Sequence, residues 1–279
     1  MLKITHNAGF FSCLSIRLEK ILEYFNNNKV LPDVVDSSEQ FREYKVNPSD
    51  DLTHYFFIEN NIDIPYITKV EITSTNNEPQ FSDYKLLNFN AIKPFIDKYF
   101  SITPAIGEKI NFLETKYKIE YDNICAVRYR GNDKAIETNA PTYSEIIEQA
   151  KKIKLANPQI NFVLQSDESE FLENFINSFP ESIIFQEIPP IKKCNMCPNF
   201  AIPIENRLTT ISYFLASIKI ISKAKYIITT SGNGELWVCI FRGNADGVYQ
   251  YLNPKEYIYG VKNESYQKDK TTFWLNCAL

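Results

Sequence analysis

The sequence predicts an α/β protein with a parallel sheet wrapped by helices, and three observations lead to this prediction. The chain has 279 residues, which is enough for two compact domains. Apolar residues make up 44% of it and charged residues 23%, so it can bury a core and is not disordered. Short apolar runs typical of buried strands alternate with amphipathic helical segments, which is the order found in parallel sheets.

The first part of the chain opens with a strand-helix-strand pattern. A strand is expected over residues 2–7, a helix over 15–26 and a second strand over 30–36. Another helix is expected from Ile92 onward, because Pro94 fits a helix only in its first turn. The last helix expected before the second half covers residues 106–117.

The second part of the chain repeats strand and helix more clearly, and the boundary between the halves is expected near residues 115–122. Thr142 and Glu145 form a capping-box pattern that predicts the start of a helix. The expected strands cover residues 124–129, 160–165, 183–185 and 226–230, and the expected helices cover residues 142–154, 167–179, 209–222 and 235–241.

Charge and hydropathy exclude several classes of protein. The net charge is −4 and there is no long basic run, so nucleic acid is not an expected partner. Residues 1–18 lack a basic region followed by a long apolar run, so no signal peptide is predicted. No apolar stretch is long enough to span a bilayer, and no transmembrane segment is expected.

The cysteines indicate a reducing compartment rather than a metal site. Cys125 lies inside an apolar run, where a reduced core thiol is expected. Cys194 and Cys197 have the spacing of half a zinc site, but no second pair exists and the only histidines are His6 and His54. The sequence therefore predicts no metal and a cytoplasmic location.

Three strand ends in the second half carry distinctive polar residues. Ligands of parallel α/β sheets bind beyond the carboxyl ends of the strands, so these residues are expected to share one edge of the sheet. The three groups are Arg130, Gly131 and Asn132; Ser166 and Asp167; and Thr230, Ser231, Gly232, Asn233 and Gly234.

Arginine at the first strand end suits an anionic ligand. The guanidinium of Arg130 can donate two hydrogen bonds to a diphosphate, and Arg128 lies on the same side of the strand by alternation. Lys134 follows shortly after and adds positive charge. The alternative interpretation of Arg130 is a solvated side chain at the end of a strand.

The other two strand ends each allow two interpretations. Residues 231–234 lead into a helix, whose free N–H groups and dipole can receive a phosphate, or they form an ordinary cap. Asp167 is either the N-cap of the following helix or a carboxylate that binds a nucleobase. No Asp-x-Asp pair and no Gly-x-Gly-x-x-Gly motif occurs, so arginine, lysine and backbone dipoles must supply the positive charge.

Taken in order, these stretches resemble the characteristic blocks of the fucosyltransferase superfamily, which includes core, nodulation and protein O-fucosyltransferases. The likeness covers roughly residues 123–241 and, more faintly, the N-terminus. It is carried by residues 127–134 (VRYRGNDK), 162–168 (FVLQSDE) and 221–231 (ISKAKYIITTS), with residues 7–12 (NAGFFS) similar to the glycine turn of that family.

The resemblance implies a GT-B-like fold, in which two Rossmann-like domains have parallel sheets that face a central cleft. Residues 1–118 would form an acceptor-side domain and residues 119–262 a domain that binds the nucleotide sugar. Residues 263–279 are expected to be a tail that packs back on the body.

The resemblance also implies a reaction. It is a metal-independent, inverting transfer of fucose from GDP-fucose to a glycan hydroxyl, without a cofactor. Arg130 would bind the diphosphate, Asp167 the base and Ser231 a phosphate. Arg128 stands where histidine is common and Gly232 replaces a serine. The alternatives are therefore another nucleotide sugar as donor, or a non-catalytic module that binds nucleotides or carbohydrates.

The candidate site residues fall into two sets. His6 is a candidate base as well as a candidate structural residue. The catalytic candidates are Arg130, His6 and Asp133, and the donor-binding candidates are Arg128, Arg130, Gly131, Asn132, Lys134, Ser166, Asp167, Thr230, Ser231, Gly232, Asn233 and Gly234.

Overall fold

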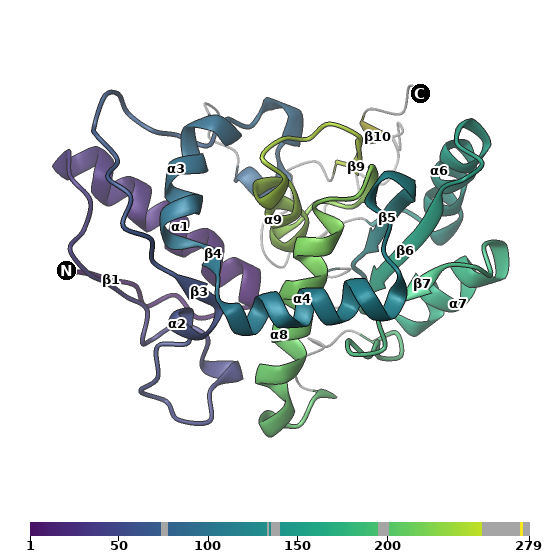
Figure 1. Ribbon diagram of the computed structural model, residues 1–279, viewed down its shortest axis with the longest axis horizontal. Helices are drawn as coiled ribbons and strands as arrows, with labels where there is room; N and C mark the ends of the chain where they lie inside the picture. Colours follow the sequence, from purple (N-terminus) through teal and green to yellow (C-terminus); the bar gives the residue numbers. More distant parts are fainter. Residues whose placement is uncertain (74–77, 133, 135–139, 195–200, 253–273, 276–279) are drawn as a thin grey trace, which may run out of the picture.

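The computed structural model describes residues 1–73, 78–132, 134, 140–194, 201–252 and 274–275 (Figure 1). It confirms a mixed α/β protein built around a six-stranded sheet, with strand order β10-β9-β8-β5-β6-β7. The five strands from β5 to β9 are parallel, and β10 pairs antiparallel with β9. The strands are β5 (Ile124–Tyr129), β6 (Asn161–Ser166), β7 (Ile183–Ile184), β8 (Tyr226–Thr229), β9 (Val248–Tyr251) and β10 (Trp274–Leu275).

The sheet is wound in both directions from its centre. The chain runs outward from β5 through β6 to β7, then returns past β5 to form β8 and β9 on the other side. The point between β5 and β8 is therefore a topological switch point, where ligands of such sheets bind.

Helices cover both faces of this sheet because the side chains of its central strand alternate between two cores. Cys125 and Val127 pack with α6 (Tyr143–Ala156) and α7 (Ser169–Ser178). Ala126 faces the opposite core, which includes residues of α8 (Ile204–Ile221) and α9 (Asn233–Arg242). By the same alternation, Arg128 points toward α8 and α9.

The N-terminal half opens with the expected strand-helix-strand unit. Strands β1 and β2, which precede and follow α1 in the chain, pair in parallel with each other. Strands β3 and β4 pair antiparallel. The elements of this half are β1 (Leu2–Lys3), α1 (Phe10–Asn28), β2 (Val35–Asp36), α2 (Thr53–Phe56), β3 (Phe57–Ile58), α3 (Phe89–Tyr99), β4 (Ser101–Ile102) and α4 (Pro104–Tyr117), with 3-10 turns η1 (Arg42–Tyr44), η2 (Pro79–Phe81) and η3 (Tyr84–Leu86).

Among the described residues of this half, the expected second parallel sheet is limited to the two-stranded pair of β1 and β2, and β3 and β4 form a separate antiparallel pair. Apolar side chains between α1 and α3 lie in short helices, turns and two-residue strands, which are too short to build a full sheet. Instead, α1 and α3 pack against α9, and α4 packs against α8, in one continuous hydrophobic core (Figure 1).

Two helix starts differ from the sequence prediction. Helix α3 begins at Phe89, because the Asn88 side chain accepts a hydrogen bond from the Ala91 N–H, and Pro94 therefore lies inside the helix. Helix α7 begins at Ser169 and not at Asp167, which leaves the Asp167 carboxylate available for other contacts. The capping box that opens α6 is confirmed, with hydrogen bonds in both directions.

The predicted core position of Cys125 is confirmed. Cys125 and Cys239 are buried free thiols, and burial raises the pKa of both. Cys197 lies outside the described residues. Over the described part of the chain, no helix is both long enough and apolar enough to cross a membrane.

Candidate functional site

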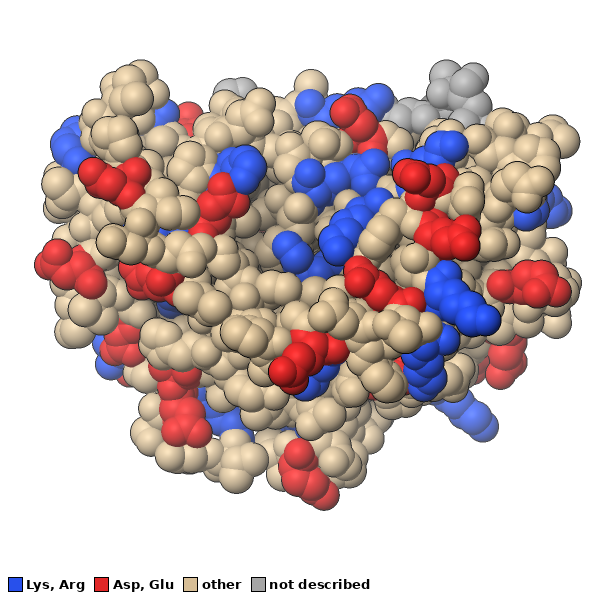
Figure 2. Space-filling view, in the orientation of Figure 1, with Lys and Arg blue, Asp and Glu red and all other residues tan. Residues whose placement is uncertain are grey.

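A cavity of about 280 Å³ lies where the carboxyl ends of β5, β6 and β8 meet the N-terminal half, and we call it the sheet-edge cavity. Arg130, Asp167 and Gly234 line it from three separate units of the sheet, as the sequence predicts. Gly9 and Tyr44 line it from the N-terminal half. Figure 2 shows Lys and Arg side chains gathered around a hollow near the centre of the face in view.

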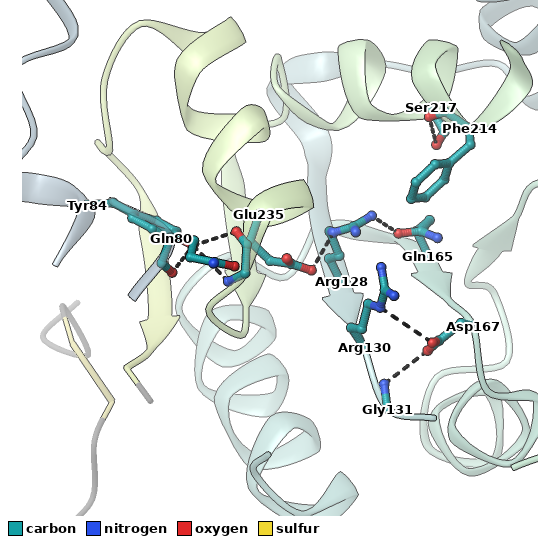
Figure 3. A network of polar contacts seen from close by, with 11 residues as sticks. Gln80, Tyr84, Arg128, Arg130, Gly131, Gln165, Asp167, Phe214, Ser217 and Glu235 are labelled. Carbon is teal, nitrogen blue, oxygen red and sulfur yellow. Dashed lines mark hydrogen bonds and ion pairs between the residues drawn. The ribbon is translucent and has the colours of Figure 1, made fainter. Parts of the chain in front are cut away.

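Arg128 is buried beneath this cavity in a network of polar contacts (Figure 3). Its Nε donates to Glu235 Oε1 at 2.7 Å, and its Nη1 donates to Gln165 Oε1 on the neighbouring strand. The guanidinium lies 5.1 Å from the ring centroid of Phe214 in α8. Arg128 therefore has a fixed orientation before any ligand binds.

The carboxylate of Glu235 is ionised despite complete burial. Burial alone would raise its pKa, but the positive charges of Arg128, Arg130 and Lys134 outweigh this effect and hold the pKa below its ordinary value. Gly234 precedes it in the first turn of α9, and a Cβ there would lie 2.3 Å from Arg128 Nη2. Only glycine allows the guanidinium to approach the helix so closely.

Arg130 lies two residues further along, at the mouth of the cavity. Its side chain is 32% exposed, and its Nε lies 3.7 Å from Asp167 Oδ2. Asp167 Oδ1 accepts a hydrogen bond of 3.0 Å from the backbone N–H of Gly131 (Figure 3). Asp167 thus orients Arg130 and its turn, and this contact is neither of the two roles that the sequence suggested.

Glu168 holds the same turn from below, and sequence reasoning missed it. Its buried carboxylate accepts hydrogen bonds from the Asn132 N–H at 2.9 Å and from the Tyr143 hydroxyl. A Cβ on Gly131 would lie 2.0 Å from Glu168 Oε1, which explains the glycine. Ser166 also serves this arrangement, since its Oγ accepts a 3.0 Å hydrogen bond from the Glu168 N–H. The sequence signal was weak, because a glutamate at a helix start is usually exposed.

We expect Glu168→Gln to lower the free energy of unfolding by about 1–3 kcal/mol, because one buried partner of the carboxylate is left unsatisfied. Tyr143→Phe removes only one hydroxyl donor and should cost about 1 kcal/mol. Urea unfolding of both variants tests this, with Glu173→Gln as the control because Glu173 is exposed on the same helix. Equal stability of the Glu168 and Glu173 variants would show that the carboxylate does not hold the turn.

Two of the predicted residues at the third strand end do not line the cavity. Ser231 Oγ donates to the carbonyl of Tyr251 at 2.9 Å and accepts from Gln250 Nε2 at 2.9 Å, both on β9. Thr230 is buried, and neither it nor Ser231 lines the sheet-edge cavity. The Ser231 hydroxyl holds the loop against β9, and its predicted phosphate contact stays a prediction.

The next residues do line the cavity and present backbone donors to it. Helix α9 begins at Asn233, and its first internal hydrogen bond is donated by Leu236 to the Gly232 carbonyl. The N–H groups of Asn233 and Gly234 donate to no group of the described residues. They lie at the positive end of the helix dipole, where anions bind favourably.

Side chains of the N-terminal half hold this loop in place. The Tyr84 hydroxyl donates to the Gly232 carbonyl and accepts from the Gly232 N–H, both at 3.2 Å. Asn233 Nδ2 donates to Gln80 Oε1 at 3.0 Å, and Ser15 Oγ donates to Asn233 Oδ1 at 2.7 Å. The two halves of the chain therefore build the helix end together.

Two further cations complete the lining of the sheet-edge cavity. The Lys134 Nζ lies 5.0 Å from the ring centroid of Phe81. Arg207, which the sequence did not single out, donates to the Ile202 carbonyl at 2.9 Å and to the Glu43 carbonyl at 3.0 Å. Lys134 and Arg207 both line the sheet-edge cavity.

The remaining catalytic candidates have different outcomes. His6 lines a neighbouring cavity rather than this one, and its Nε2 lies 3.0 Å from Ser12 Oγ. Ser12 lines both cavities. Asp133 lies outside the described residues. Over the described part of the chain, no group of three or more His, Cys, Asp and Glu side chains is placed to hold a metal ion.

Comparisons with known proteins give a partial likeness. No family model and no curated protein matches the chain. Among solved structures, the chain is similar to NodZ alpha-1,6-fucosyltransferase co-crystallized with GDP, at 14% identity over 50% of this chain and 41% of the other, with a TM-score of 0.36. It is also similar to NodZ alpha-1,6-fucosyltransferase soaked with GDP-fucose, at 13% identity over 55% and 47%, with a TM-score of 0.40. The chain spans less than half the length of either structure, so its function is inferred from its own residues.

Proposed function

We propose that the chain is a glycosyltransferase that holds the diphosphate of a nucleotide sugar in the sheet-edge cavity. The donor in this proposal is GDP-fucose, on the strength of the three sequence blocks that resemble fucosyltransferases. The reaction inverts the anomeric carbon, needs no bound metal and uses a glycan hydroxyl as acceptor. The acceptor would bind on the N-terminal side, as in a GT-B arrangement. The protein would act in the cytoplasm.

One observation carries the proposal. Cationic side chains after β5 and the free N–H groups at the start of α9 meet in one cavity at the switch point of a parallel sheet. Arg128 and Arg130 line the cavity from the same side of β5. Lys134 also lines it, and its Cε lies 3.6 Å from the position that a Cβ on Gly232 would take. This combination of charge and backbone donors suits a diphosphate.

The chemistry follows from this arrangement. When the bond between the anomeric carbon and the diphosphate oxygen breaks, its electron pair stays on the diphosphate. Arg130, with Lys134, stabilises this growing negative charge. The acceptor hydroxyl attacks from the opposite side of the sugar, which inverts the configuration. His6 is the proposed base, since burial lowers its pKa and keeps the imidazole neutral near pH 7.

Thermal unfolding with a panel of nucleotides tests the donor assignment. GDP and GDP-fucose should stabilise the chain by about 2.7 kcal/mol at a hundredfold excess over Kd, and EDTA should not abolish the effect. UDP and ADP should stabilise it less. Release of fucose from GDP-fucose should be slower in His6→Asn, while the thermal shift with GDP is kept.

The other outcomes separate the alternatives. A larger shift with UDP or ADP would assign another nucleotide sugar as the donor. A shift with GDP but no sugar release, with or without glycan acceptors, would indicate a non-catalytic binding module. The absence of any nucleotide-dependent shift would overturn the proposal.

A further inference from the structure

A second cavity, of about 780 Å³, lies beside the sheet-edge cavity, and we call it the α1 cavity. Side chains of α1 form one wall, residues 69–72 a second, and the start of α9 a third. The segment at residues 69–72 is fastened to α1, because the Asn26 amide donates to the Val70 carbonyl and accepts from the Val70 N–H, both at 2.8 Å. The cavity therefore has defined walls in the folded chain.

The two cavities meet at a shared wall. Ser12, Gln80 and Asn233 line both of them. Lys134 lines the sheet-edge cavity and Phe81 lines the α1 cavity, and these two side chains are in cation-π contact. A ligand in one cavity therefore lies next to a ligand in the other.

The imidazole of His6 lies at this junction. His6 lines the α1 cavity and contacts Ser12, which belongs to the shared wall. The imidazole therefore lines the cavity that Arg130 does not line. This is the side from which an attacking hydroxyl has to arrive if the diphosphate leaves toward Arg130.

The lining of the α1 cavity combines apolar and polar groups. Ile16, Leu22 and Ile240 contribute apolar surface, whereas Ser15 and Asn233 contribute hydrogen-bonding groups. Sugars present the same combination, because their C–H faces are apolar and their hydroxyl edges are polar. The surface therefore suits a saccharide better than a purely apolar or purely ionic ligand.

The two cavities differ in the balance of charged residues that line them. The sheet-edge cavity is lined by four cationic and three acidic residues, namely Arg128, Arg130, Lys134, Arg207, Glu43, Asp167 and Glu235. The α1 cavity is lined by four glutamates and one lysine, namely Glu19, Glu23, Glu71, Glu78 and Lys69. Lys20 pairs with Glu23, and Lys69 pairs with Glu71. Glu19 makes no ion pair or hydrogen bond with the described residues. Among those residues, the Glu78 carboxylate accepts a hydrogen bond only from the uncharged side-chain amide of Gln80.

We propose that the α1 cavity is the acceptor site, and that it takes a neutral or amine-bearing saccharide and rejects anionic ones. This inference rests on the proposed function. In the transfer step, the acceptor oxygen forms a bond to the anomeric carbon as the bond from that carbon to the diphosphate breaks. The proton of the acceptor hydroxyl passes to His6, and the bonding pair leaves with the diphosphate.

Binding of three matched β-1,4-linked tetrasaccharides, made of glucose, glucosamine or glucuronate, tests the charge preference. The full chain is first saturated with GDP, and saccharide binding is then followed by saturation-transfer NMR. Glucosamine tetramer should bind most tightly and glucuronate tetramer most weakly. Each of Glu19→Gln and Glu78→Gln should reduce the preference for the cationic sugar by about two- to fivefold.

The control variant is Glu148→Gln, whose carboxylate pairs with Lys151 on α6 and lines neither cavity. It should leave the order of affinities unchanged. Binding of glucuronate as tightly as glucosamine, an order unaffected by the Glu19 and Glu78 variants, or no saccharide binding to the GDP-bound chain would each overturn the inference. Failure of GDP itself to bind would instead refute the proposed function.

Discussion

Arg130→Ala should slow release of the nucleoside diphosphate from the sugar donor by about 10²–10³-fold, which is the usual cost of removing a group that stabilises developing negative charge. Arg130→Lys should recover only part of this rate, because an ammonium keeps the charge but loses the planar pair of donors. The measurement is the turnover rate with GDP-fucose at saturating concentration.

Stability controls separate this effect from misfolding. Arg130 is about one-third exposed and its ion pair with Asp167 is long, so its removal should change the free energy of unfolding by no more than about 1 kcal/mol. Arg42→Ala provides a matched loss of charge, since Arg42 is exposed and pairs with Glu39 outside the cavity. Turnover in Arg130→Ala equal to that in Arg42→Ala would contradict the catalytic role.

Glu235→Ala should lower the free energy of unfolding by about 3–5 kcal/mol, because it leaves the buried guanidinium of Arg128 without its counter-charge. Combining it with Arg128→Met should recover part of this loss, since no unpaired charge is then buried. Urea unfolding of the two single variants and the double variant measures the coupling. Additive losses in the double variant would contradict the account of Arg128 and Glu235 as one unit.

This ion pair also gives stability a defined dependence on pH. The pKa of Glu235 is held below its ordinary value of 4.5 in the folded chain. Its contribution is therefore complete above the pKa of the unfolded chain and is lost as the pH falls through the folded pKa. In Glu235→Gln, this loss of unfolding free energy at low pH should disappear. In the exposed control Glu148→Gln, it should remain.

The C-terminal sheet was predictable because its signals are local. Strands β5 and β6 are runs of six residues with nearly continuous burial. The capping box formed by Thr142 and Glu145 determines the start of α6 through residues that are close in the sequence. The N-terminal half gave weaker signals. Its strands are two residues long, and the start of α3 depends on a cap at Asn88 that the position of Pro94 obscured.

The site was predictable in part for a related reason. Strand alternation and topology bring Arg128, Arg130 and Asp167 to one edge, and both effects can be derived from the sequence. The direction of the Ser231 hydroxyl cannot be derived from the sequence, because it depends on contacts with β9, twenty residues later. Glu168 was missed for the same reason, since its partner Asn132 lies 36 residues away in the chain.

If the two cavities bind the proposed donor and acceptor, their shared wall makes the two ligands interdependent. Asn233 is hydrogen-bonded at the same time to Gln80 and to Ser15, and it also begins the helix whose first residues line the sheet-edge cavity. A nucleotide that shifts this residue alters the surface offered to a saccharide. Thermodynamic reciprocity would then require the saccharide to change nucleotide affinity by the same factor, so the proposed donor and acceptor should bind cooperatively.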